Sequence, residues 1–516
     1  MLLSLLIFLP ILFAGAVAVW PHKNTVRHLA LALAAVEFAV SLLLLGRFDQ
    51  GSAALQLVEN VPWIERFGVS YFVGIDGISL MLVLLTTFLT PVIVLASWKS
   101  IDERVRGFHA ALFVLQTAML GSFLAMDAVL FYIFWELSLV PMYFIVGIWG
   151  GARRIYATVK FFIYTMAGSV LMLLAIIYMM TLTPQVTGGA MSASLLDFYK
   201  LEIPFIANSF FTAQTLLFFA FAIAFAIKVP MFPLHTWLPD AHVEAPTPGS
   251  VVLAGVMLKM GTYCFLRWVI PLFPQATEHF GWIFIAAGVI GIVYGALVAM
   301  VQPDVKKLVA YSSVSHMGYI IVGLFTMNVY GVNGALYQML NHGISTGALF
   351  LLIGMIYERT HSREIAKYGG LAGALPIFTI IFIIVTMSSI AVPLTNGFVG
   401  EFLILLGSYQ YSPAVAAVSV SGVVLGAAYM LWMVKRVFFG PKGDLVIESE
   451  KDPQHTLHDL NAREIAVMAP LVVLIFWMGL WPNQFMNYAK TSVDHLIQNK
   501  HNYTLSLAPG GSTSEQ

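Results

Sequence analysis

Runs of about 20 consecutive apolar residues recur along the whole chain, and this feature limits the fold more than any other. One of them, FYIFWELSLVPMYFIVGIWG at residues 131–150, is long enough to cross a bilayer as a helix. Strands of a membrane barrel would instead alternate apolar and polar residues over about ten positions. Because 59% of the 516 residues are hydrophobic and only 10% are charged, we expect an all-α, polytopic membrane helical bundle.

Polar residues, glycines and prolines divide the chain into about fourteen expected transmembrane helices. These spans lie near residues 2–20, 26–46, 75–98, 108–126, 128–149, 157–182, 209–230, 247–272, 281–300, 306–327, 331–357, 373–410, 414–438 and 464–482. Basic residues such as Arg153, Arg154 and Lys306 gather in the loops of one alternating side. The positive-inside rule therefore predicts that both termini lie outside.

Composition excludes several classes of function. The formal net charge of +0 and the spread of basic residues along one membrane face give no sign of a nucleic acid or acidic partner. The one cysteine, Cys264, excludes disulfides within the chain, cysteine-rich metal sites and iron–sulfur clusters. Neither a GxxxxGK[ST] loop nor a GxGxxG turn after a strand is found. We expect that the chain binds no nucleotide or metal and carries no electrons itself.

Six ionisable residues inside the expected spans are the candidate functional residues: Glu136, Lys228, Lys259, His316, His342 and Glu401. A charge near mid-membrane costs at least about 2.5–3.5 kcal/mol, so such residues usually pair, face a wet cavity or carry function. The alternative is that each makes an interhelical hydrogen bond or ion pair that only fixes packing.

Two of the expected spans are interrupted beside an ionisable residue. Lys228 directly precedes Val229-Pro230, and Glu401 follows Pro393 and a loop-like Thr395-Asn396-Gly397. Proline removes a backbone donor, and broken helices leave backbone dipoles and room for water near mid-membrane. Two such breaks favour a transport site over ordinary packing.

The two breaks also suggest an internal repeat. Spans four to eight align roughly with spans nine to thirteen as two inverted five-helix repeats, which pairs Lys228 of the seventh span with Glu401 of the twelfth. The predicted organisation is three N-terminal helices (1–100), a first repeat (101–275), a second repeat (276–440), and a cytoplasmic loop, last helix and C-terminal tail (441–516).

Polar residues also form stripes at helical spacing, Ser312 with His316 on one span and Gln338, His342, Ser345 and Thr346 on the next. Such a stripe can hold water, or it can serve helix packing through hydrogen bonds worth about 0.6 kcal/mol each. We favour function for His342, and both interpretations stay open for Gln338 and Ser345.

A buried lysine and a nearby glutamate have the energy scale that proton movement needs. At 4 Å and an effective dielectric near 20 their attraction is about 4 kcal/mol, and moving one proton against an assumed potential of about 200 mV costs about 4.6 kcal/mol. Our hypothesis is that Glu136 modulates Lys228, and that Lys259 and the histidines pass protons to Glu401 through ordered water.

Several segments together resemble a known family: FWELSLVPMYFIVGIWG, KVPMFPLHTWLPDAHVEAPTPGS, LAGVMLKMGTYCFLR, DVKKLVAYSSVSHMGYI, NHGISTGALFLLIG and NGFVGEF. From about residue 70 to 440 the chain is similar to the M chains of bacterial NADH:quinone oxidoreductase, respiratory complex I, which are related to mitochondrial subunit 4. The fourteen-span plan extends this similarity to the whole chain.

The resemblance implies a proton-pumping, antiporter-like subunit of the complex I membrane arm, located in a bacterial inner membrane between the L and N chains. It implies that Glu136, Lys228, Lys259 and Glu401 match the family's proton-channel residues, and that His316 and His342 match supporting residues of the hydrated axis. It also implies that NADH, FMN, the iron–sulfur clusters and quinone are bound by other chains.

One position departs from the family pattern, because Leu394 stands after Pro393 where a glycine is expected. The alternative function is the D-type subunit of a multi-chain cation/proton antiporter. The motifs FWE…VPMY and WLPDAHVEAPT favour the complex I family over this alternative. A passive spacer fits poorly with charges on separate helices. The loop at 438–464 and the tail after Pro482 are expected to be solvated connectors.

Overall fold

The computed structural model describes residues 1–22, 25–207, 209, 211–451 and 457–508. In this part of the chain, twelve helical segments are long and apolar enough to cross a bilayer, which confirms the all-α membrane bundle. They are α1 (Leu2–Val19), α2 (Val26–Arg47), α3 (Gly77–Ser100), α4 (Val105–Leu124), α5 with α6 (Ala128–Trp149), α7 with α8 (Arg154–Thr187), the segment Thr247–Leu272, α15 (Pro274–Met300), α16 (Val305–Phe325), α17 (Val329–Thr360), α21 (Pro413–Phe438) and α23 (Ala462–Leu480).

Two further spans are broken helices, as the sequence predicted. The first consists of α10 (Ala213–Lys228) and α11 (Trp237–Glu244), and the second of α19 (Pro376–Ser389) and α20 (Asn396–Tyr411). Pro230 lacks an N–H donor, and the next residue, Met231, donates its N–H to the carbonyl of Ala226 at 2.9 Å, which closes the first helix end. Together with the twelve continuous segments, these spans are consistent with the expected fourteen.

Two interruptions were not predicted. At Ser138 the fifth span divides into α5 (Ala128–Leu137) and α6 (Leu139–Trp149). The eighth span, Thr247–Leu272, is a series of short pieces: α12 (Thr247–Val252), the π-helical turn η2 (Leu253–Met257), α13 (Leu258–Cys264), a second π-helical turn η3 (Phe265–Val269) and α14 (Ile270–Leu272). Single π-helical turns occur frequently at functional sites.

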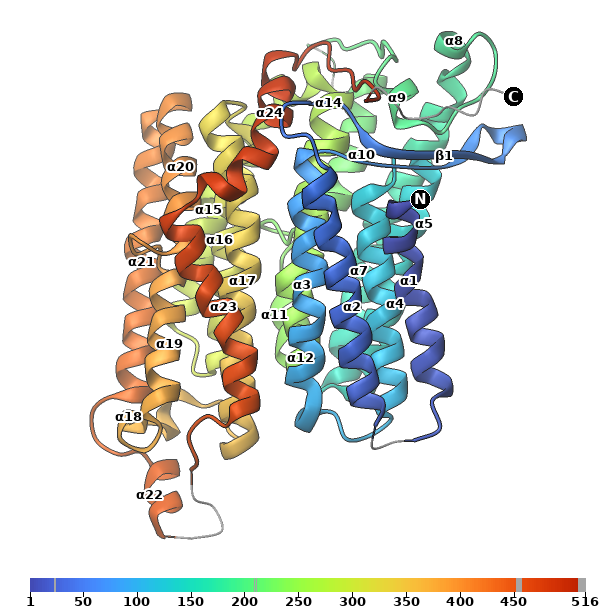
Figure 1. Cartoon of the computed structure of the whole chain (residues 1–516). Helices are drawn as coiled ribbons and strands as arrows, with labels where there is room; N and C mark the ends of the chain where they lie inside the picture. The colour runs from blue at the N-terminus through green and yellow to red at the C-terminus, as the bar shows by residue number, and fades with distance from the viewer. Residues whose placement is uncertain (23–24, 208, 210, 452–456, 509–516) are drawn as a thin grey trace.

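The helices form two groups, blue to cyan and yellow to orange in Figure 1, with the green helices α10 to α12 between them. Helix α11 packs on α16, and α12 and η2 pack on α17, so the seventh and eighth spans connect the two groups. Short helices α9 (Leu195–Phe198), α18 (Leu371–Ala374) and α22 (Asp444–Lys451) lie in the connections.

One end of the bundle carries structure that the sequence analysis did not predict. Strands β1 (Gln56–Ile64) and β2 (Val69–Ile75) form an antiparallel hairpin, joined by the 3-10 turn η1 (Glu65–Phe67) and Gly68. Gly68 has a φ of 63°, and a Cβ there would lie 1.8 Å from the Met191 carbonyl oxygen. Only glycine fits this close approach.

The tail after Pro482 is not a solvated connector in its described part. It forms helix α24 (Asn483–Gln498), which packs against α3 and α17. Ser492 Oγ accepts a hydrogen bond from the Gly77 N–H at 3.1 Å, and Leu507 pairs with Leu55 beside the hairpin. In the loop at 438–464, residues 452–456 lie outside the described residues.

Candidate functional site

The first group of candidate residues lies where two helix breaks meet. Lys228 is the last residue of α10, and its ammonium donates to Ser138 Oγ at 3.1 Å, at the division between α5 and α6. The same ammonium lies 5.1 Å from the centroid of the Trp135 ring, a cation–π distance. With 1% of its surface exposed, Lys228 depends on these contacts for the stabilisation of its charge.

Glu136 lies beside this lysine without pairing directly with it. In the described part of the chain no ion pair within 4.0 Å joins the two side chains, and Glu136 Oε1 is buried with no hydrogen-bond partner. Glu136 itself is half-buried. The structure therefore shows the pair in a separated arrangement, with the Ser138 hydroxyl taking the contact that the carboxylate would make.

The second group forms a continuous line. Lys259 is in α13, between the two π-helical turns, and is fully buried. Its ammonium lies 2.7 Å from His342 Nδ1 on α17 and also donates to the carbonyl of Ala254 in η2. The rings of His342 and His316 are 5.8 Å apart between centroids. These contacts bring together groups from the eighth, tenth and eleventh spans.

The line ends at Glu401 on α20. His316 Nδ1 lies 3.0 Å from Glu401 Oε1, and Gln338 Nε2 donates to the same oxygen at 3.1 Å. Asn341 in turn donates to Gln338 Oε1 at 3.1 Å. Hydrogen bonds to a carboxylate are stronger than bonds between neutral groups, so this end of the line is firmly fixed.

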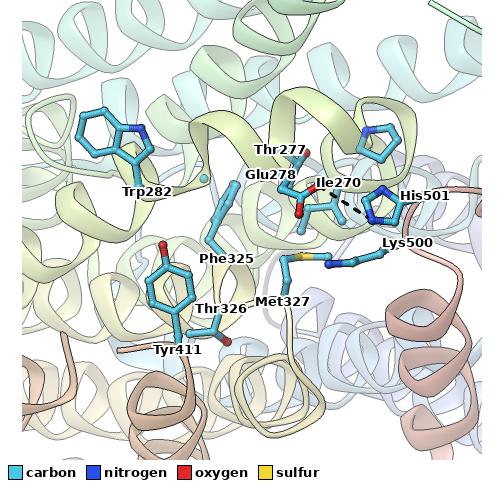
Figure 2. A pocket seen from close by; sticks show the side chains of 12 residues that line it. Ile270, Thr277, Glu278, Trp282, Phe325, Thr326, Met327, Tyr411, Lys500 and His501 are labelled. Atoms are coloured by element: carbon cyan, nitrogen blue, oxygen red, sulfur yellow. Dashed lines mark ion pairs between the residues drawn. The ribbon is translucent and has the colours of Figure 1, made fainter. Parts of the chain in front are cut away.

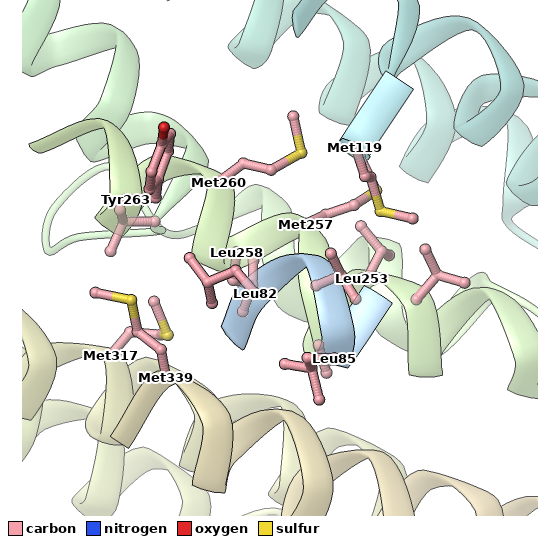
Figure 3. Packing of buried hydrophobic residues seen from close by; sticks show 14 of the residues in the cluster. Leu82, Leu85, Met119, Leu253, Met257, Leu258, Met260, Tyr263, Met317 and Met339 are labelled. Atoms are coloured by element: carbon pink, nitrogen blue, oxygen red, sulfur yellow. The ribbon is translucent and has the colours of Figure 1, made fainter. Parts of the chain in front are cut away.

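An apolar shell surrounds the line. Figure 3 shows methionines from α4, η2, α13, α16 and α17 gathered around the Lys259 helix: Met119, Met257, Met260, Met317 and Met339. All five are buried. A shell of this kind excludes bulk water and lowers the local dielectric, which strengthens every electrostatic interaction inside it.

The two groups are not joined directly. Within the described residues, no hydrogen bond or ion pair connects Lys228 with Lys259, although α10 packs on α13. The backbones approach closely at Gly261, where a Cβ would lie 3.0 Å from the Phe225 carbonyl oxygen and 3.0 Å from the Val229 nitrogen. A proton passing between the two lysines therefore needs bridging water.

Two residues of the polar stripe on α17 have different partners. Gln338 binds the carboxylate of Glu401, whereas Ser345 Oγ lies 2.6 Å from Ser388 Oγ at the end of α19. Ser388 Oγ donates to Asn396 Oδ1 at 2.5 Å, across the break. Ser345 thus fixes the broken helix, and the break itself is lined by hydroxyl and amide groups.

The two broken helices carry their ionisable residues at different places. Lys228 stands at its break, as expected, but Glu401 lies within α20, past the break. Leu394 lies in the break with a φ of 74°, in the left-handed region that favours glycine. Glycine adopts this backbone conformation without strain, which is consistent with the expectation of a glycine at this position.

Sequence reasoning missed several buried polar residues. His242 on α11 is fully buried, and neither ring nitrogen has a hydrogen-bond partner. Lys306 donates to the Ala245 carbonyl at 2.6 Å, and Arg267 pairs with Asp76 at 2.6 Å. Arg267 could have been predicted in the same way as Lys259, because it is a charged residue within an apolar span. Within the described residues, no three His, Cys, Asp or Glu side chains are arranged to hold a metal ion.

Comparisons with known proteins agree with this fold and site. Residues 125–426 match the family described as NADH:quinone oxidoreductase/Mrp antiporter, transmembrane region, and residues 2–126 match the amino terminus of NADH-ubiquinone oxidoreductase chain 4. Subunit M of NADH-quinone oxidoreductase from Rhodobacter capsulatus is 47% identical over 97% of both chains. Chain 4 of NADH-ubiquinone oxidoreductase from Marchantia polymorpha is 40% identical over 96% of this chain and 97% of its own.

Solved structures show the same architecture. A chain of respiratory complex I from Thermus thermophilus superposes with a TM-score of 0.83 and 30% identity, covering 96% of this chain and 99% of that one. A chain of the Mrp complex of a Dietzia species has a TM-score of 0.79 at 22% identity over 95% of this chain and 52% of that one, so it shares the fold.

The fold and the buried line of ionisable groups define an antiporter-like, polytopic membrane subunit. More specifically, the chain belongs to the subunit M (chain 4) family of NADH-quinone oxidoreductase, and it is a subunit of that enzyme complex. The recognition made from its motifs is confirmed.

Proposed function

We propose that this chain moves protons across the membrane through a Glu/Lys/His relay, driven by electron transfer in other subunits. The observation that carries the proposal is the line of four buried side chains from Lys259 through His342 and His316 to Glu401. Each member can hold or release a proton, and each lies on a different span.

The contacts define which atoms exchange the proton. Lys259 Nζ gives a proton to His342 Nδ1, and the ring then releases its other proton from Nε2, which has no protein partner. The distance between the two histidine rings leaves this transfer to one bridging water. His316 receives the proton and delivers it through Nδ1 to Glu401 Oε1.

The group around Lys228 controls when Lys259 receives a proton. In the observed arrangement the Lys228 ammonium contacts Ser138 and Trp135, and Glu136 is free to approach it. When the carboxylate pairs with Lys228, it favours the charged lysine, and when it withdraws, Lys228 releases its proton towards Lys259. Opening and closing this pair is the step through which energy from elsewhere in the complex enters the chain.

We further propose the setting of the subunit in its complex. NADH, FMN, the iron–sulfur clusters and quinone are held by partner subunits, with the L and N chains as its neighbours in the membrane arm. The inner membrane of a bacterium is the proposed location, supported by the relative from Rhodobacter capsulatus. The uneven distribution of basic residues supports both termini on the periplasmic side.

Two inverted five-helix repeats, at 101–275 and 276–440, remain our proposal for the internal organisation, and matching backbone bridges support it. Ala128 N–H donates to the Ala193 carbonyl at 2.8 Å, and Val305 N–H donates to the Arg363 carbonyl at 3.0 Å. The first bridge lies near α9 and the second precedes α18, at opposite ends of the bundle in Figure 1. Opposite ends are what an inverted repeat requires.

The helix breaks supply a second match. Met231 N–H donates to the Ala226 carbonyl at 2.9 Å, and Val392 N–H donates to the Met387 carbonyl at 3.0 Å, five residues back in each case. When Ala226 and Met231 are aligned with Met387 and Val392, Lys228 corresponds to a position at the end of α19, and not to Glu401. The repeats therefore share a backbone design while placing their ionisable side chains differently.

The alternative is the D-type subunit of a multi-chain cation/proton antiporter. The Mrp complex chain shares the fold, but this chain covers only 52% of its length at 22% identity. The near-complete coverage of subunit M relatives favours the complex I assignment.

The proposal is tested with Lys259→Met in the assembled complex, by measuring NADH-driven proton uptake into inverted membrane vesicles. Methionine keeps the length and apolar contacts of the side chain but cannot carry a proton, so uptake is expected to stop while assembly is retained. Lys490→Met, at an exposed position of α24, is the matched control. Normal uptake in Lys259→Met would contradict the relay.

A further inference from the structure

A cavity of about 230 Å³ lies at the end of the bundle where α15 begins and α16 and α20 end. Figure 2 shows the side chains that converge on it from α15, from the segment after α16 and from the tail that follows α24. None of the described residues that line this cavity belongs to either group of ionisable side chains.

The cavity wall combines a cation with a carboxylate. Lys500 and His501 come from the tail, and Glu278 comes from the first turns of α15. His501 Nε2 lies 3.9 Å from Glu278 Oε2, which leaves the Lys500 ammonium as the main positive group of the wall. A wall with both signs of charge complements a zwitterion better than a simple anion.

An unpartnered hydroxyl also points to a ligand. Thr277 lines the cavity with 4% of its surface exposed, and its Oγ1 has no hydrogen-bond partner in the part of the chain that the structure describes. Buried hydroxyl groups in folded proteins are nearly always hydrogen-bonded. A ligand oxygen in the cavity would satisfy this group.

The surroundings of the cavity indicate a lipid. Trp282 and Tyr411 line it and are 60% and 47% exposed, as expected of aromatic residues at a membrane–water interface. Below them on α15, Ile290, Tyr294 and Leu297 are also exposed and continue an apolar surface along the helix. The cavity is thus placed for a headgroup, with apolar chains extending along α15.

We propose that this cavity binds the headgroup of phosphatidylethanolamine, a zwitterionic phospholipid with a primary ammonium. Its phosphate lies towards the Lys500 ammonium and the Thr277 hydroxyl, and its ammonium lies towards the Glu278 carboxylate. Both charges of the headgroup then have a partner, and the buried hydroxyl is satisfied. This site is independent of the proposed proton relay.

The test reconstitutes the purified complex in nanodiscs that contain either a photoreactive phosphatidylethanolamine or a photoreactive phosphatidylglycerol. After illumination, labelled peptides are mapped by mass spectrometry. We expect phosphatidylethanolamine to label the peptides around Trp282 and Tyr411. In Lys500→Met and Thr277→Val this labelling is expected to be about tenfold lower, since each loses a hydrogen bond to a charged phosphate. Lys490→Met is the control and keeps full labelling.

Glu278→Gln tests the zwitterion specifically. The variant removes the partner of the lipid ammonium but keeps Lys500, so the preference for phosphatidylethanolamine over phosphatidylglycerol is expected to disappear. Equal labelling by both lipids in the parent protein would overturn the assignment and indicate ordinary surrounding lipid. Unchanged labelling in both Lys500→Met and Thr277→Val would overturn it as well.

Discussion

The two groups of ionisable residues use the same side chain, a buried lysine, in opposite ways. Lys228 lies at the meeting of two helix breaks, contacts a neutral hydroxyl and a ring, and has its carboxylate neighbour unpaired. Lys259 lies between two π-helical turns and begins a line that ends at a doubly hydrogen-bonded Glu401. In the proposed mechanism, the first group changes partners and the second group conducts protons.

Position within the helix therefore matters as much as residue type. A break provides room for a carboxylate and a lysine to separate, whereas the methionine-lined interior around α13 is closely packed. Variants that remove a proton carrier from the second group should therefore be more damaging than variants that remove a neutral contact from the first.

Glu401→Gln is expected to have the largest effect in the second group, together with Lys259→Met. Glutamine keeps the shape and can still accept hydrogen bonds from His316 and Gln338, but it cannot take up a proton. Proton uptake should fall by at least about 100-fold, the usual contribution of a positioned acid–base group. The measurement is NADH-driven uptake in vesicles, with Glu448→Gln on the exposed face of α22 as the control. A rate within a factor of two of the parent would remove Glu401 from the route.

Gln338→Leu is expected to have an intermediate effect. The substitution keeps the volume of the side chain but removes one hydrogen bond to the Glu401 carboxylate, which should slow proton uptake by about tenfold. Ser345→Ala, which removes a contact to the break and none to the carboxylate, is the comparison. If Ser345→Ala slows uptake more than Gln338→Leu does, the break is more important than the carboxylate contact.

Ser138→Ala is expected to have a smaller effect, about threefold on the uptake rate, because the lost contact is to a neutral hydroxyl and Glu136 can replace it. Proton uptake in vesicles measures this effect beside that of Glu136→Gln, which is expected to stop uptake. A loss in Ser138→Ala as large as the loss in Glu136→Gln would show that Glu136 does not replace the hydroxyl as a partner of Lys228.

Leu394→Gly tests the break without touching a proton carrier. Leu394 is 63% exposed, so little packing is lost, and glycine relieves a left-handed backbone conformation. Stability should rise by about 0.5–1 kcal/mol after the entropy cost of glycine is subtracted. Thermal unfolding of the assembled complex measures this change. Leu431→Gly, at an exposed site inside helix α21, should instead lower stability. A decrease in both variants would contradict the interpretation that the backbone is strained at Leu394.

Much of the fold and most of the second group could be predicted because membrane burial makes its signals strong. Lys259, His316, His342 and Glu401 stood out as ionisable residues in apolar runs, and the structure brings them into one line. The sequence could not show that Ser138 divides a span or that π-helical turns flank Lys259. Both depend on tertiary packing, which apolar composition does not record.

The helix in the C-terminal tail is also indicated by the sequence. The tail residues Ala489, Ser492, Val493 and Leu496 are spaced as one face of a helix, and all four are buried in α24. His242 stood in a quoted motif, but its burial on the half-helix α11 required knowledge of where the broken span resumes.

Both groups are proposed to belong to one proton route, which Glu136→Gln probes at its beginning. Among the described residues, no hydrogen bond or ion pair joins Glu136 to the second group, so we expect its loss to act through Lys228. NADH-driven proton uptake and electron flow are compared between the parent and Glu136→Gln at matched levels of assembled complex. We predict that both collapse while the complex stays assembled. If both continue unchanged, Glu136 is a packing residue and the route does not begin at Lys228.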